Sequence, residues 1–179
     1  LTPQSLEAAR RGEFMRVVLE CRRLVYDGMT FENVKINCRD VQIDLARLLG
    51  EKEIHFLRVG ELRPWGEMGP ESVKRFLSLQ VPEIPITDVK LRQKVLMRGR
   101  ALGLPLEASA RLYLSADHTQ LTVHWDDLKA AGVRVPPALT SFLQDIEFSL
   151  EPTPKLPARI LLSSLEIEND RLIVKGRVE

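Results

Sequence analysis

The stretch LPLEASARLYLSADHTQLTVHW, Leu104–Trp125, predicts two strands joined by a short turn. Its first half places aliphatic residues at every second position, which is the period of a strand with one buried face. The segment SADHTQ is rich in turn-forming residues, and LTVHW then resumes the alternation. Because the connection is too short for a crossover, the two strands are expected to run antiparallel.

The preceding stretch DVKLRQKVLMRGRAL, Asp88–Leu102, also alternates with the two-residue period of a strand, but its polar side is mostly cationic. Its odd positions are largely aliphatic, whereas its even positions form a cationic row. The cations of this row are Lys90, Arg92, Lys94, Arg98 and Arg100. We interpret the stretch as one strand whose outer face is either simply solvated or in contact with an anionic lipid surface.

Further hairpins are predicted on both sides of these strands. The segment Met15–Leu49 predicts a hairpin that turns at Asp27–Gly28 and continues through Leu45. Its apolar side changes near Arg39–Asp40, which indicates a bulge or a bend there. EIHFLRVGELRPW predicts a further strand, and the chain ends with two strands around the turn Asn169–Asp170.

Three segments have the composition and spacing of helices. PQSLEAARRGEF predicts a short helix ending near Gly12, and GPESVKRFLSL predicts a helix with Pro70 in its first turn. PPALTSFLQDIEFSL, residues 136–150, predicts an amphipathic helix of about three turns. Asp126–Asp127 is interpreted as a structural pair at a helix start. The order of elements predicts an α+β fold in which a strongly curved, mostly antiparallel sheet wraps around short helices.

The length and composition favour one domain with an aliphatic core. A chain of 179 residues suits a single domain, residues 1–179. Residues 1–13 are expected to form a lead-in helix, and two cases stay open: that an N-terminal segment before it was removed, or that there was none. The net charge of +1 argues against a chain-wide basic field of the kind that drives nucleic-acid binding, so any anion site must be local, and no aromatic residue interleaves the cationic row as in a single-strand binder. The sequence begins at Leu1, so we expect a membrane-peripheral or extracytoplasmic location if a signal or anchor was removed, and a cytoplasmic location otherwise.

No catalytic or metal-binding pattern stands out in the sequence. Cys21 and Cys38 are too few for a disulfide scaffold, and the three histidines do not cluster with them. The chain has no glycine-rich phosphate loop and no nucleophile elbow. We therefore expect a protein that is not an enzyme and that has no cofactor and no metal.

Three other stretches together resemble one protein family. They are YDGMTFENVKINCRDVQID, MGPESVKRFL and KLPARILLSSLEIENDRLIVKGRV. In their order and spacing over Phe14–Val178, they resemble the LmeA-like phospholipid-binding envelope proteins. The resemblance implies a fold similar to that of the tubular lipid-binding proteins and a phospholipid or fatty acyl ligand. It also implies a role in membrane or envelope lipid homeostasis without catalysis.

With this resemblance, the aliphatic faces become candidates for the wall of a lipid cavity. The candidate cavity residues are Val89, Leu91, Val95, Leu104, Leu106, Ala108, Ala110, Leu112, Leu114, Phe142 and Ile146. The cationic row supplies the candidate contacts to lipid headgroups or to an anionic membrane. The alternative is a protein-interaction or scaffold module whose aliphatic faces form a filled core without a ligand.

Overall fold

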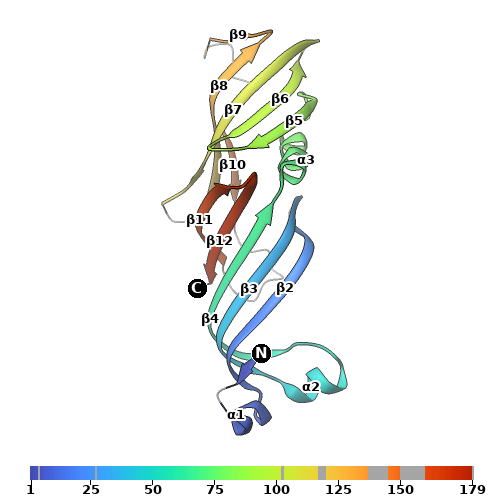
Figure 1. Ribbon diagram of the computed structural model, residues 1–179, viewed down its shortest axis with the longest axis vertical. Coiled ribbons are helices and arrows are strands. Elements are labelled where there is room, and N and C mark those ends of the chain that lie inside the picture. The colour runs from blue at the N-terminus through green and yellow to red at the C-terminus, as the bar shows by residue number, and fades with distance from the viewer. Residues whose placement is uncertain are drawn as a thin grey trace.

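Two antiparallel sheets lie one after the other along an elongated molecule in the computed structural model (Figure 1). The structure describes residues 1–3, 5–26, 28–101, 103–116, 120–136, 145–149 and 160–178. All strand pairs within these residues are antiparallel. The α+β class and the antiparallel pairing predicted from the sequence are therefore confirmed.

The first sheet joins the N-terminal part of the chain to its last hairpin. In sheet order its six strands within the described residues are β1 (Thr2–Pro3), β2 (Glu13–Tyr26), β3 (Met29–Ile43), β4 (Phe56–Met68), β12 (Arg171–Val178) and β11 (Ile160–Glu168). β12 pairs with β4 on one side and with β11 on the other. The sheet is therefore open, with β1 and β11 at its edges. It brings together strands that are far apart in the sequence.

The second sheet is built mostly from consecutive hairpins. Its order is β10 (Ile146–Ser149), β8 (Gln120–Ala130), β7 (Leu104–Leu114), β6 (Val95–Ala101) and β5 (Ile86–Leu91), and β9 (Val133–Arg134) also pairs with β8. The two strands predicted at Leu104–Trp125 are the central pair, β7 and β8. Their antiparallel arrangement is confirmed.

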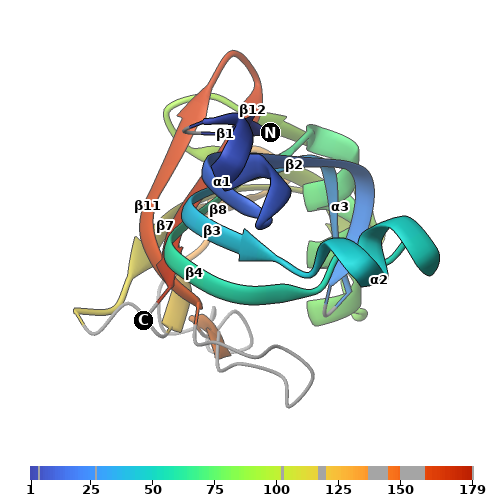
Figure 2. The same ribbon diagram turned by 90° about the horizontal axis from the view of Figure 1, so that it is seen from below.

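Three helices lie within the described residues, two at one end of the molecule and one between the two sheets. The helices are α1 (Leu6–Arg10), α2 (Leu45–Gly50) and α3 (Pro70–Gln80). α1 and α2 lie at the end of the molecule that carries the N-terminus, and Figure 2 shows this end from below. α3 contacts β3 of the first sheet and β5 of the second sheet. It is therefore the helix that connects the two sheets.

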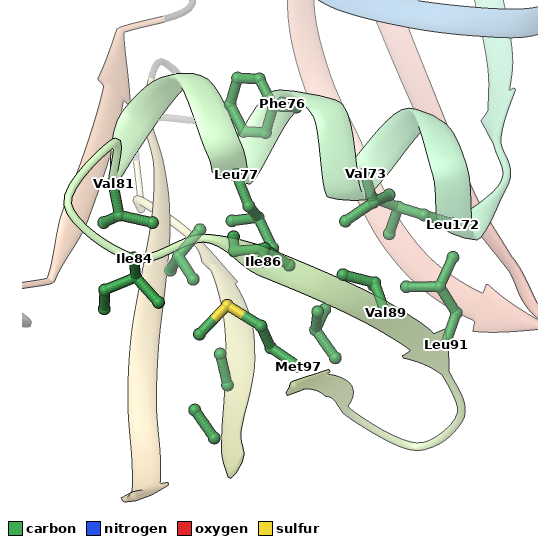
Figure 3. Close-up of a cluster of buried hydrophobic side chains, with 14 of the residues drawn as sticks. Val73, Phe76, Leu77, Val81, Ile84, Ile86, Val89, Leu91, Met97 and Leu172 are labelled. Atoms are coloured by element: carbon green, nitrogen blue, oxygen red, sulfur yellow. The ribbon is translucent and has the colours of Figure 1, made fainter. Parts of the chain in front are cut away.

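The main core lies between α3 and the second sheet. Val73, Phe76 and Leu77 are buried on one side of α3, at the helical spacing expected from the sequence. Figure 3 shows these side chains above Val89 and Met97 of the hairpin β5–β6. Pro70 occupies the first turn of the helix, where its missing N–H costs no hydrogen bond. The predicted helix at Gly69–Leu79 is confirmed.

A second cluster of buried apolar side chains lies between the first sheet and α2. It contains Phe14, Val17, Cys38, Val41 and Ile43. The buried residues of β3 change from even to odd numbers between Cys38 and Val41, because the strand bends at Asp40, where φ is +50°. The bend predicted at Arg39–Asp40 is confirmed, and the pairing of β3 with β2 keeps its register across it.

Several predicted elements differ from the structure. Asp88–Leu102 is not one strand, because Arg92–Lys94 form a turn between β5 and β6. The strand through Val41 ends at Ile43, since the Asp44 side chain accepts a hydrogen bond from the backbone N of Arg47 and starts α2. Asp126–Asp127 lies inside β8 and does not start a helix.

The helix predicted over residues 136–150 is wrong at its end. Ile146–Ser149 form β10, which pairs with β8 and so satisfies its backbone groups in a sheet. The parts of that prediction at residues 137–144 and at residue 150 lie outside the described residues. The two sheets are neither closed nor strongly curled. A tubular sheet wrapped around helices therefore stays a prediction.

Candidate functional site

An apolar cavity lies where the two sheets meet α3. Its volume is about 310 Å³. Its wall consists of Leu24, Met29, Phe31, Val34, Ile36, Pro64, Trp65, Gly66, Met68, Val73, Phe76, Leu77, Val95, Leu112, Leu121, Val123, Leu162, Leu165, Leu172, Val174 and Gly176. None of these wall residues carries a charge, so the cavity suits hydrocarbon rather than a polar solute.

The first sheet builds its part of the wall from five adjacent strands, β2, β3, β4, β12 and β11. Phe31 lies over Gly66, because a Cβ atom on Gly66 would be 2.8 Å from the Cδ1 atom of the ring. Val34 and Val174 pair with Gly66 from β3 and β12. A residue without a side chain in the middle of the sheet thus leaves room for an aromatic ring on the cavity wall.

Helix α3 closes the cavity with Val73, Phe76 and Leu77. Its start is held by Glu32 of β3, whose Oε1 atom accepts a hydrogen bond from the backbone N of Gly69 at 3.1 Å. The other carboxylate oxygen, Oε2, forms an ion pair with Arg171 of β12. A carboxylate at a helix N-terminus is stabilised by the helix dipole. This network fixes α3 to the first sheet beside the cavity.

The second sheet contributes residues from its three middle strands. Val95 of β6 and Leu121 and Val123 of β8 are buried, and Leu112 of β7 is half-buried. Leu112 pairs directly with Val123, so the two side chains lie on the same face. This face is the continuation of the core beneath α3.

The predicted cavity residues are divided between the cavity and the solid core. Val95 and Leu112 line the cavity. The residues packed in the core without lining the cavity are Val89, Leu91, Leu106, Ala108 and Ala110. Leu104 is 51% exposed and Leu114 is half-buried at the end of β7. The backbone of Ile146 lies in β10, and Phe142 lies outside the described residues.

Most of the wall was not predicted from the sequence, since it comes from the first sheet and α3. Phe31 and Trp65 lie on β3 and β4, and Leu165 and Val174 lie on β11 and β12. A signal was present in the alternation of apolar residues along these strands. It did not indicate which alternating faces would meet, because that depends on pairing between distant strands.

The cationic row lies on the outer face of the hairpin β5–β6, opposite the cavity side. Lys94 forms an ion pair with Asp126 at 2.8 Å, and Arg98 forms one with Glu107 at 3.1 Å. Lys90 and Arg92 are exposed and border a polar recess. Arg100 is exposed near the end of β6. Carboxylates of the neighbouring strands thus neutralise part of the row.

Asp126 is the centre of the charged network on this face. It is the extra residue of a bulge, since Ser109 pairs with Asp127 while Ala110 pairs with Trp125. Hydrogen bonds from Arg111 and Lys94 hold the pKa of Asp126 well below its usual range. The arrangement is that of a structural ion-pair cluster on a sheet surface.

The described residues contain neither a cluster of metal-binding side chains nor a helix suited to crossing a membrane. Within them, no group of three or more His, Cys, Asp and Glu side chains is placed to hold a metal ion. No helix in this part of the chain is long and apolar enough to cross a membrane.

Comparison with known proteins gives a family for the chain. No curated protein and no solved structure matches it. The sequence profile of the family described as LmeA-like phospholipid-binding matches residues 5–177, which is nearly the whole chain. The chain belongs to the LmeA-like phospholipid-binding family.

Proposed function

We propose that the protein binds a phospholipid or another acyl-chain lipid without catalysis, and that the acyl chain occupies the apolar cavity. The observation that carries this proposal is the wholly apolar wall built by both sheets and α3. The cavity volume of about 310 Å³ lies at the lower end of the range of small-molecule sites. Membership of a phospholipid-binding family supports a lipid as the ligand.

The energetics favour hydrocarbon as the main source of affinity. Burial of an acyl chain contributes about 0.8 kcal/mol per methylene, so ten methylenes contribute roughly 8 kcal/mol. An exposed ion pair contributes about 0 to 1 kcal/mol. The apolar wall would therefore determine affinity, and charged groups near the headgroup would determine lipid preference. By this mechanism the protein would carry or hold lipid in membrane or envelope lipid homeostasis.

The protein should contain lipid after mild purification. Native mass spectrometry and solvent extraction should show a bound phospholipid or fatty acid, and the delipidated protein should take up a fluorescent acyl probe. A clean ligand-free mass together with no uptake of the probe would support the alternative, a scaffold module with no ligand. Appreciable hydrolysis of ester substrates by the purified protein would contradict the absence of catalysis.

A further inference from the structure

We propose that the tip of the β2–β3 hairpin and the C-terminal half of α3 form a rim that docks on an anionic phospholipid bilayer. The rim consists of Leu24, Val25 and Leu79. It would place the cavity against the membrane from which lipid enters. The inference deepens the proposed function and rests on it for what the cavity holds.

The rim gathers exposed aliphatic side chains beside the cavity. Leu24 is 40% exposed and also lines the cavity, so it belongs both to the surface and to the wall. Val25 follows it in β2, lies on the opposite face of the hairpin and is 66% exposed. Leu24 pairs with Phe31, which places both side chains on the same face of the sheet. The hairpin tip therefore continues the apolar wall outward through Leu24 and exposes Val25 on its other face.

Helix α3 brings the third residue to the same place. Leu79 is 60% exposed, and a Cβ atom built on Gly28 would lie 3.5 Å from its Cδ1 atom. The buried side of α3 is already occupied by Val73, Phe76 and Leu77. Leu79 is thus not needed for the core and contacts the hairpin tip from outside.

The charges next to the rim fit an anionic lipid surface. Arg23 precedes Leu24, and Arg75 lies one helical turn before Leu79. Both arginines are exposed, and neither forms an ion pair within the described residues. The sequence Arg22–Gly28 contains two arginines and one aspartate. Aliphatic side chains flanked by cations are typical of surfaces that enter the interface of anionic membranes.

The end of the molecule that carries α2 is the natural comparison, because the rim lies midway along the molecule, where the two sheets meet (Figure 1). Leu49 is 81% exposed and Leu57 is 56% exposed, and they lie at α2 and the start of β4. Neither residue lines the cavity. If general surface hydrophobicity drove membrane binding, these residues would contribute as much as the rim. The proposal requires that they do not.

The test measures co-sedimentation of the full chain with vesicles of equal parts phosphatidylcholine and phosphatidylglycerol. The double variant Val25→Asp/Leu79→Asp should bind about tenfold more weakly than the parent, because it places two carboxylates in the interface. The matched control, Leu49→Asp/Leu57→Asp, should sediment like the parent. A rim variant that sediments like the parent, or a control that loses as much binding, would overturn the proposal.

Two further measurements separate docking from cavity binding. Uptake of a dispersed fluorescent fatty acid should be unchanged in the rim variant, because neither Val25 nor Leu79 lines the cavity. If the parent sediments with vesicles but takes up no fatty acid, docking is supported and the cavity function is refuted. The variant Arg23→Glu/Arg75→Glu should lose binding to the mixed vesicles and should keep any weak binding to pure phosphatidylcholine. Equal binding of this variant to the mixed vesicles would contradict the role given to the arginines.

Discussion

The ring of Phe31 lies over Gly66 on the wall of the apolar cavity, at a position where a Cβ atom on Gly66 would be 2.8 Å from the ring. The variant Gly66→Ala should therefore displace the ring, and the unfilled cavity is the space available to it. We expect weaker uptake of a fluorescent acyl probe and a loss of up to about 1 to 3 kcal/mol in the free energy of unfolding from overpacking.

The control for this variant is Gly50→Ala. A Cβ atom on Gly50 would meet nothing within 4 Å, and Gly50 lies at the end of α2, away from the cavity wall. Its probe uptake should match that of the parent, and its free energy of unfolding should not fall, because alanine is a better helix former than glycine. Unchanged probe uptake in Gly66→Ala would show that Phe31 does not limit the space for lipid.

Leu112 and Leu106 lie on the same strand, and only Leu112 lines the cavity. The variant Leu112→Trp should block lipid uptake with little change in the midpoint of urea unfolding, because the indole enters unfilled space. Leu106 is 4% exposed in the solid core, so Leu106→Trp should cost about 1 to 3 kcal/mol of stability. Equal losses of stability in both variants, with no effect specific to uptake, would favour a filled core at Leu112.

Local signals predicted the helices and turns whose cause is local. Pro70 and the spacing of Val73, Phe76 and Leu77 were sufficient for α3. The turn at Asn169–Asp170 was also predictable, since Asn and Asp tolerate the positive φ values of 50° and 57° found there. Helix α2 was missed because its apolar residues continue from a strand, and only its cap at Asp44 marks the change.

The hairpin β5–β6 was missed for a different reason. Val89 pairs with Met97, and Lys90 pairs with Leu96. Across the three-residue turn, odd-numbered residues therefore pair with odd-numbered residues and even-numbered residues with even-numbered ones. The alternation therefore continues through Arg92–Lys94 as it would along one strand. No glycine, proline or asparagine marks the turn. The cations consequently lie closer together than one extended strand would place them.

Most of the cavity wall depended on contacts that no local pattern specifies. The meeting of Phe31 with Leu165 and Leu112 on one cavity requires β12 to pair with β4 and the two sheets to share α3. Val95 and Leu112 were predicted because they lie on the aliphatic faces of strands in the second sheet. Those faces also supply the solid core, and the sequence does not indicate which residues border unfilled space.

Glu32 should stabilise the protein through the start of α3. Glu32→Ala removes the hydrogen bond to Gly69 and the ion pair with Arg171, and we expect a loss of about 1 to 2 kcal/mol in the free energy of unfolding. Urea denaturation measures this loss. Glu53→Ala, at an exposed residue with no ion pair in the described part of the chain, should be nearly neutral. Similar values for the two variants would contradict the capping role.

The Asp126 carboxylate should make stability depend on pH. Its side chain is 9% exposed, and its oxygens lie 2.6 Å from Nη2 of Arg111 and 2.8 Å from Nζ of Lys94. These cations lower the pKa of Asp126 in the folded state, whereas an aspartate in the unfolded chain takes up a proton near pH 3.9. The unfolded state therefore binds more protons as the pH falls. The stabilisation is complete above that value and is lost as the pH falls toward the pKa of the folded state.

Asp126→Asn tests this linkage by removing the titrating group and keeping the shape. Above about pH 5 we expect the variant to be less stable than the parent by about 1 to 2 kcal/mol in urea denaturation. The difference should shrink progressively below about pH 4, because the parent alone loses the contribution of the ionised carboxylate. In a Lys94→Gln background, one of the two cations is absent, so the same substitution should cost less. A difference between parent and Asp126→Asn that stays constant from pH 6 to about pH 2 would show that the ion-pair cluster does not stabilise the fold through the charge of Asp126.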